Sequence, residues 1–352
     1  MIFDLLATAH DFASADQSKL TDLVCELLRA HRRGHHLLII PRAECDWLAD
    51  NLDLNSKERA TLSRIRHDFT QAGGLRNKAL VRVSIEIAHK SGPVSDGNRI
   101  VVGLLDAATF DLTERAQLIV EDSQYDGKLY QAILDAVKNN VQAPAVGFEI
   151  RNGGGQSAYQ VWKQQIDAKR LTCLLVDSDR DHYDQDEKSE VKRARVDAER
   201  AQWPFAWALC LPCREIENLV PFSILEQLPF ALDKAAQLHA LRRIEETEIA
   251  GGVPVEQRFS HYYDMKNGLG DRPLDERLPE NVVLWWEGKI AHGGNRPCYT
   301  GFGGHIIRHL LEHTPCLQGF LRYVKSESWW NIFGELFALV LWVGFAPRRN
   351  AT

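Results

Sequence analysis

Two aspartates with one residue between them follow a short apolar segment near the middle of the chain. Residues 171–176 are mostly apolar and β-prone, and Asp177 and Asp179 come directly after them. An apolar run of this length is typical of a strand buried on both faces of a parallel sheet. Alternation along the strand direction would place both carboxylates on one side. Because two like charges held close together repel each other, the pair indicates a site for a divalent cation.

Two further carboxylates follow other predicted strands. Glu121 ends one of them, and Glu217 lies a few residues after another. Open parallel sheets bind ligands beyond the carboxyl ends of their strands, so we expect both glutamates to converge with Asp177 and Asp179. Oxygen ligands of this kind suit Mg²⁺ or Mn²⁺ better than zinc. A carboxylate cluster with such ions can activate water and stabilise a leaving oxygen in phosphodiester hydrolysis. The simpler alternatives are a helix cap for Glu121 and a favourable charge at a helix start for Glu217.

The elements that must position these residues alternate regularly between strand and helix. This pattern predicts a parallel sheet covered by helices on both sides, within a domain spanning 115–225. The charge-rich segment 180–200 is predicted to be a solvated helix or loop. The predicted strands are 116–121, 145–150, 171–176 and 203–210, and the predicted helices are 126–137 and 157–168.

Segments on either side complete a predicted α/β fold. Residues 1–110 are predicted to form an N-terminal α/β unit of unknown role, and residues 226–352 a mainly helical C-terminal region. The N-terminal unit has predicted helices at 16–33, 42–51 and 56–72, strands at 35–41, 80–88 and 99–105, and a turn-rich break at 91–97. Helices are also predicted at 222–248, 304–313 and 328–345, with an irregular stretch after residue 251.

Composition restricts the partners and the compartment. The net charge of −6 means that any contact with nucleic acid must be local or assisted by a metal ion. Seven cysteines in no framework spacing, and a start unlike a signal peptide, predict a cytoplasmic protein with reduced thiols. The apolar stretch 329–345 contains Asn331 and Glu335 and is shorter than the roughly 20 residues of a membrane span, so a buried helix is predicted instead.

Several motifs within 115–225 together resemble a Toprim domain, in particular that of the OLD-type nucleases and their small stand-alone relatives in prokaryotic anti-phage defence. The first motif is the strand that ends in Glu121, and a run of three glycines at 153–155 follows it. The remaining motifs are Leu-Val-Asp-Ser-Asp, ending at Asp179, and Arg-Glu-Ile-Glu-Asn, ending at Asn218.

The resemblance implies a parallel sheet flanked by helices and the activity of a metal-dependent endonuclease. It assigns catalytic roles to Glu121, Asp177, Asp179 and Glu217, all of them also ligands of Mg²⁺ or Mn²⁺, with Glu121 as a ligand or general base. It also suggests that Lys266 stabilises charge in the transition state.

The resemblance also implies Asp126 as a metal ligand. Asp126 stands five residues after Glu121, where four are expected, so Asp122 is an alternative to it. Glu217 is expected to complete the cluster, and Glu215 is a second candidate for that role.

The resemblance implies DNA or RNA as the substrate and allows a homo-oligomer. Full-length OLD-type nucleases carry an ATPase domain, but this sequence contains no GxxxxGK[ST] motif, so any ATPase must be a separate subunit. The alternative function is a non-catalytic Toprim-fold subunit that regulates or supports a partner ATPase. Metal binding distinguishes the two hypotheses, because a scaffold has no need of converging carboxylates.

Overall fold

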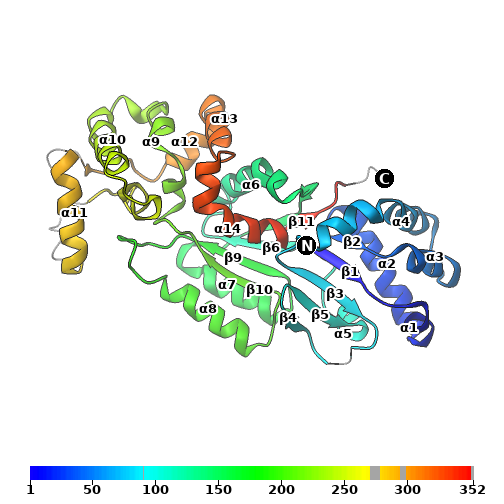
Figure 1. Cartoon of the computed structure of the whole chain (residues 1–352). Helices are drawn as coiled ribbons and strands as arrows, with labels where there is room; N and C mark the ends of the chain where they lie inside the picture. Colours follow the sequence, from blue (N-terminus) through cyan, green and yellow to red (C-terminus); the bar gives the residue numbers. More distant parts are fainter. Residues whose placement is uncertain (90, 270–277, 294–298, 350–352) are drawn as a thin grey trace.

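The computed structural model describes residues 1–89, 91–269, 278–293 and 299–349 and has an α/β architecture with two separate sheets of mainly parallel strands. Figure 1 shows the two sheets in the middle and right of the molecule, with most of the helices of the C-terminal region at the left. The prediction of parallel sheets flanked by helices is confirmed. No helix in the described ranges is long and apolar enough to cross a membrane.

The N-terminal sheet has the strand order β2-β1-β3-β5-β4, in which only β4 is antiparallel to its neighbour. Its central strand β3 was predicted to be half-exposed, but three of its five residues are buried because it lies between β1 and β5. The break predicted at 91–97 contains the exposed edge strand β4. The strands are β1 (Ile2–Leu5), β2 (Leu37–Ile39), β3 (Arg82–Glu86), β4 (Val94–Asp96) and β5 (Arg99–Gly103).

Five helices accompany this sheet, and three of them match the predicted ranges closely. Helix α2 has its apolar side chains on one face, begins at an aspartate cap and ends at Gly34, whose φ of 73° suits the left-handed helix end. The helices are α1 (Ala9–Ser14), α2 (Gln17–Arg33), α3 (Arg42–Asn51), α4 (Ser56–Arg76) and α5 (Leu104–Thr109).

The second sheet is entirely parallel, with the strand order β10-β9-β6-β8. The two central strands, β6 and β9, are buried along their whole length, which explains their mostly apolar sequences. The predicted strand 145–150 is divided in two by Gly147, since its second half joins this sheet and its first half pairs elsewhere. The strands are β6 (Ala116–Val120), β7 (Ala145–Val146), β8 (Phe148–Asn152), β9 (Thr172–Val176) and β10 (Ala206–Cys210).

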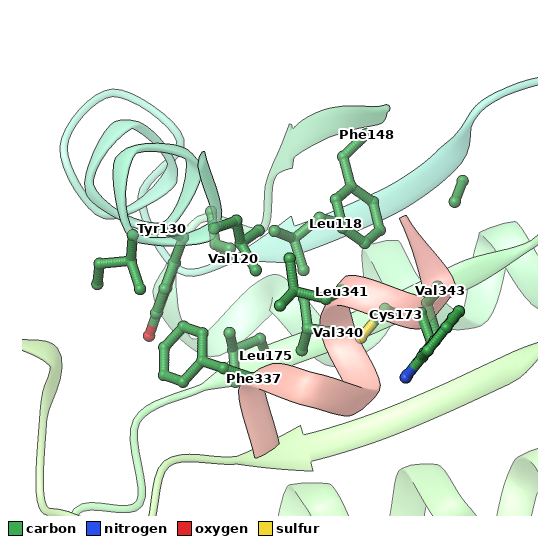
Figure 2. Close-up of a cluster of buried hydrophobic side chains, with 14 of the residues drawn as sticks. Leu118, Val120, Tyr130, Phe148, Cys173, Leu175, Phe337, Val340, Leu341 and Val343 are labelled. Atoms are coloured by element: carbon green, nitrogen blue, oxygen red, sulfur yellow. The ribbon is translucent and has the colours of Figure 1, made fainter. Parts of the chain in front are cut away.

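Helices cover both faces of the second sheet. Helices α7 and α8 lie on one face, and α6 and α14 lie on the other (Figure 1). Figure 2 shows Phe337, Val340 and Leu341 of α14 packed on side chains of β6 and β9, including Leu118 and Leu175. The last helix of the chain therefore completes the core of the sheet on which the predicted site depends. The four helices are α6 (Asp126–Val137), α7 (Ala158–Asp167), α8 (Ser189–Arg200) and α14 (Glu327–Val343).

The C-terminal region is mainly helical, as predicted, but its helices are shorter and more numerous. The predicted helix 222–248 is interrupted around Pro229, because proline cannot donate the backbone hydrogen bond that a helix interior requires. The helices are α9 (Phe222–Leu225), α10 (Ala235–Ala250), α11 (Glu280–Gly293), α12 (Ile306–Glu312) and α13 (Thr314–Tyr323). Within the described ranges, the 3-10 helices are η1 (Lys138–Val141), η2 (Gly155–Ser157), η3 (Ile216–Leu219), η4 (Pro229–Ala231), η5 (Val255–Gln257) and η6 (Phe259–His261). A final strand, β11 (Phe345–Ala346), pairs antiparallel with β7.

Candidate metal centre

The loops after β9 and β10 are joined directly beyond the carboxyl ends of these two strands. The backbone N–H groups of Ser178 and Asp179 both donate to the carbonyl oxygen of Arg214, each at 2.9 Å. The Ser178 hydroxyl donates to the carbonyl oxygen of Cys213 at 2.6 Å. These bonds bring Asp177, the first residue after β9, beside the 3-10 helix η3 that follows β10.

Three buried carboxylates meet at this point: Asp177, Glu215 and Glu217, here called the inner triad. One oxygen of each lies within 4.8 Å of the others. Their exposed fractions are 7%, 6% and 3%, so all three are shielded from water. The Ile216 N–H donates to Asp177 Oδ1 at 3.0 Å, which fixes the orientation of that carboxylate.

The electrostatics of the inner triad favour a bound cation. Burial raises the pKa of Asp177 well above its ordinary value, and the negative charges of Glu121 and Glu217 raise it further. Burial is also the main cause of the raised pKa of Glu215 and of Glu217. Each carboxylate is therefore costly to ionise unless a positive charge lies close by.

The inner triad carries more negative charge than its neighbouring lysine offsets. Glu217 Oε2 is buried and forms an ion pair with the Lys266 ammonium at 3.2 Å, and the same ammonium pairs with Glu215. One positive charge beside three buried carboxylates leaves negative charge that a further cation would offset. Three converging carboxylates fit a hard, oxygen-binding ion. The inner triad could therefore hold a metal ion.

Lys266 lies against the inner triad, as the resemblance led us to expect for a site residue. Its Nζ atom is 3.1 Å from Glu215 Oε2 and 3.2 Å from Glu217 Oε2. Burial alone would lower its pKa, but Glu217 and Glu215 outweigh that effect and raise it, so the side chain stays an ammonium.

The loop that carries Lys266 is closely packed. Glu215 Oε1 accepts a hydrogen bond from the Met265 N–H at 2.8 Å, and the Asn218 side-chain amide donates to the carbonyl oxygens of Ser260 and Tyr263. Gly301 covers the loop so closely that a Cβ atom there would lie 2.0 Å from the Lys266 carbonyl oxygen. Lys266 is thus held near the triad by its backbone as well as by its charge.

Glu121 and Asp179 form a second, more exposed pair, here called the outer pair. Lys188 bridges them, with its Nζ 3.0 Å from Glu121 Oε1 and 2.7 Å from Asp179 Oδ2. We expected Asp177 and Asp179 to share one side, but β9 ends at Val176 and strand alternation does not continue beyond it. Asp179 instead has a left-handed backbone with φ of 54°, and its side chain pairs with Lys188. The two aspartates therefore have different surroundings.

Asp126 contributes to the negative field of the inner triad, whereas Asp122 is engaged in local structure. The Asp122 N–H donates to Asp126 Oδ2 at 3.1 Å, and the Asp122 side chain accepts from the Gln124 N–H at 2.7 Å. Burial and the nearby charge of Glu217 raise the pKa of Asp126 to about 7. Of these two alternatives, Asp126 is the one that interacts with the triad. Glu215 and Glu217, the other two alternatives, both belong to the inner triad.

The three glycines at 153–155 shape the loop beside Glu121 and do not form an open phosphate cradle. The N–H groups of Gly154 and Gly155 donate to the Glu121 carbonyl oxygen at 3.0 and 3.2 Å. A Cβ atom at Gly153 would lie 2.6 Å from Ala158 Cβ, which leaves no room for a larger residue. The glycines thus allow the chain to fold back closely around the end of β6.

The residue that the sequence reasoning missed altogether is Lys188. It lies in the charge-rich segment predicted to be solvated, of which 189–200 is the helix α8. No spacing rule marks one lysine among many charges, so only the fold identifies its carboxylate partners.

The chain matches no protein-family model, and comparisons with curated proteins and with solved structures also give no match. The resemblance to Toprim nucleases therefore stays a prediction. What can be said of this chain comes from its own residues and their geometry.

Proposed function

We propose that this protein is a metal-dependent nuclease that hydrolyses phosphodiester bonds of DNA or RNA, with Mg²⁺ or Mn²⁺ bound at the inner triad. The observation that carries the proposal is the meeting of three buried carboxylates, Asp177, Glu215 and Glu217, beyond the ends of two parallel strands. Such a position is where open parallel sheets bind ligands. The order of the acidic residues along the chain supports a Toprim-like arrangement as part of this proposal.

The residues of the site have separate roles in this proposal. Asp177, Glu215 and Glu217 would hold the ion, and Asp126 and Glu121 would add to the negative field that attracts it. When bound, a divalent ion lowers the pKa of water and polarises a phosphate oxygen. Lys266, held beside the triad as an ammonium, would attract the phosphate group and offset charge that develops on it. The net charge of −6 makes such local positive charges important for a polyanionic substrate.

The ligand set proposed here differs from the expected set of Glu121, Asp126, Asp177, Asp179 and Glu217 in several respects. Glu121 and Asp179 pair with Lys188 outside the triad, and Asp126 adds its charge from beside it. Glu215 takes the place expected for Asp179. A role as an effector in anti-phage defence, acting with a separate ATPase subunit, belongs to this proposal through the resemblance alone.

One observation favours the alternative of a non-catalytic regulatory or scaffold subunit. Lys188 and Lys266 already pair with four of the carboxylates, as they would in a site that has no use for a metal ion. The two functions differ in metal binding, which a scaffold does not require.

The experiment that tests the proposal is cleavage of supercoiled plasmid, linear DNA and tRNA with Mg²⁺ or Mn²⁺. Wild type is compared with Asp177→Asn and Glu217→Gln, which keep the side-chain size and remove one charge each. Glu226→Gln is the control, since Glu226 forms an ion pair with Arg242 outside the triad. We expect cleavage by wild type and by the control only. A wild type that binds no metal and cuts none of these substrates would favour the scaffold, and cleavage that survives both triad substitutions would refute the site.

A further inference from the structure

The outer pair already has a cation, and that cation is part of the chain. The Lys188 ammonium lies within ion-pair distance of one oxygen of Glu121 and one of Asp179. The lysine therefore occupies the space between the two carboxylates, where a divalent ion would otherwise lie.

The fold holds Lys188 and its partners in place from several directions. Lys188 immediately precedes helix α8, and the neighbouring Glu187 binds Arg195 of that helix through two ionic hydrogen bonds. At the other end of the segment, the Asp181 side chain pairs with Arg214, and its carbonyl oxygen accepts a hydrogen bond from the Trp286 indole at 3.1 Å. The segment between β9 and α8 is thus anchored near both of its ends.

The backbone of Asp179 supports the same arrangement. A left-handed φ is unfavourable for a residue with a side chain, so the surrounding contacts must hold Asp179 there. Its N–H donates to the Arg214 carbonyl oxygen at 2.9 Å, and in this conformation its carboxylate meets Lys188. A divalent ion at the outer pair would have to displace an ammonium that the fold has positioned.

We propose that Lys188 acts as a built-in cation in place of a second divalent ion, so that the protein binds one ion, at the inner triad. This inference rests on the proposed function, because it assumes that the inner triad holds metal. Lys188 is a positioning residue in this scheme: it holds Glu121 and Asp179 together and keeps a second metal ion out. The site would then combine one divalent ion with two ammonium groups, from Lys188 and Lys266.

The test is the number of Mn²⁺ ions bound at saturation, measured by isothermal titration calorimetry and by the electron paramagnetic resonance signal of free Mn²⁺. Wild type is compared with Lys188→Met and Lys188→Gln, which remove the charge, and with Lys188→Arg, which keeps it. Lys192→Met is the matched control, because Lys192 lies on α8 but pairs with the exposed Asp186 at 2.9 Å. Circular dichroism confirms that each variant is folded.

We expect one ion in wild type, Lys188→Arg and Lys192→Met, and two in Lys188→Met and Lys188→Gln. Adding Asp179→Asn to Lys188→Met should return the number to one, and Asp177→Asn alone should reduce it to none. One ion in every Lys188 variant, or two in wild type, would overturn the role of Lys188 and leave the proposed metal site standing. No bound ion in wild type or in any Lys188 variant would overturn both.

Discussion

The strongest test of the electrostatic reasoning is the substitution Asp126→Asn in metal-free protein. Asparagine has nearly the same shape and can keep the hydrogen bond from the Asp122 N–H, which is 3.1 Å long. It removes the negative charge that burial and Glu217 make unfavourable. We therefore expect the variant to be more stable than wild type wherever Asp126 would be ionised, although it weakens the site for metal.

The magnitude follows from the pKa of Asp126, which is about 7 in the folded chain against an ordinary value of 3.8. Between these two values the folded state binds one more proton than the unfolded state, so wild-type stability falls as the pH rises. The full difference corresponds to about 4 kcal/mol above pH 7. Because Asp126 is only partly buried, solvent screening reduces our expectation to about 2–3 kcal/mol.

The assay is urea unfolding in a chelator at pH 4, 5, 6, 7 and 8, which gives the free energy of unfolding of both proteins. The difference between variant and wild type should be near zero at pH 4 and grow to its full size by pH 8. Asp135→Asn is the matched control on the same helix, since Asp135 is half-exposed and pairs with Lys138 at 3.1 Å. Its stability should stay within about 0.5 kcal/mol of wild type at every pH.

A stability difference that does not change with pH would refute the electrostatic explanation, and so would a variant less stable than wild type at pH 8. Excess Mn²⁺ provides a second check. A cation at the inner triad would attract the Asp126 carboxylate, so the advantage of the variant should shrink when the metal is present.

Three further predictions concern other parts of the molecule. First, Mn²⁺ at 100 times its dissociation constant should stabilise wild type by about 2.7 kcal/mol, and the same concentration should leave Asp177→Asn unchanged in thermal unfolding. Secondly, burial lowers the pKa of His31 to about 4. Between pH 6.5 and 4 the unfolded state therefore binds one more proton than the folded state, so wild-type stability falls by about 1.4 kcal/mol for each pH unit of acidification. His31→Asn should remove this loss, as measured by urea unfolding. Thirdly, Gly301→Ala should cost about 1–3 kcal/mol in the same assay, because its Cβ would collide with the Lys266 carbonyl oxygen, whereas Gly304→Ala, with open space around it, should be neutral.

Much of the local structure could be predicted because the signals are local. The sequence pattern located α2, α3 and α4 closely, and short, mostly apolar runs located β6 and β9. Short or exposed elements such as β1 and β4 were missed, since they are only three or four residues long and carry little pattern. The position of α14 on the second sheet is a long-range contact that periodicity cannot reveal.

The sequence by itself determined that acidic residues would gather beyond the ends of parallel strands, because strand direction places all carboxyl ends on one edge. It indicated Asp177, Glu217 and Lys266 as members of the cluster, and the structure does bring these three together. The carboxylates were expected from strand order and from the residues that follow each strand, whereas Lys266 was expected from the resemblance.

Only the tertiary structure decided how the acidic residues divide between the inner triad and the outer pair. The left-handed backbone of Asp179 and its ion pair with Lys188 direct the Asp179 side chain away from Asp177. The Glu215 side chain is held inward by a hydrogen bond from the Met265 N–H and by its ion pair with Lys266. Loop conformation depends on contacts between residues that are far apart in the sequence, and the spacing of residues does not predict those contacts.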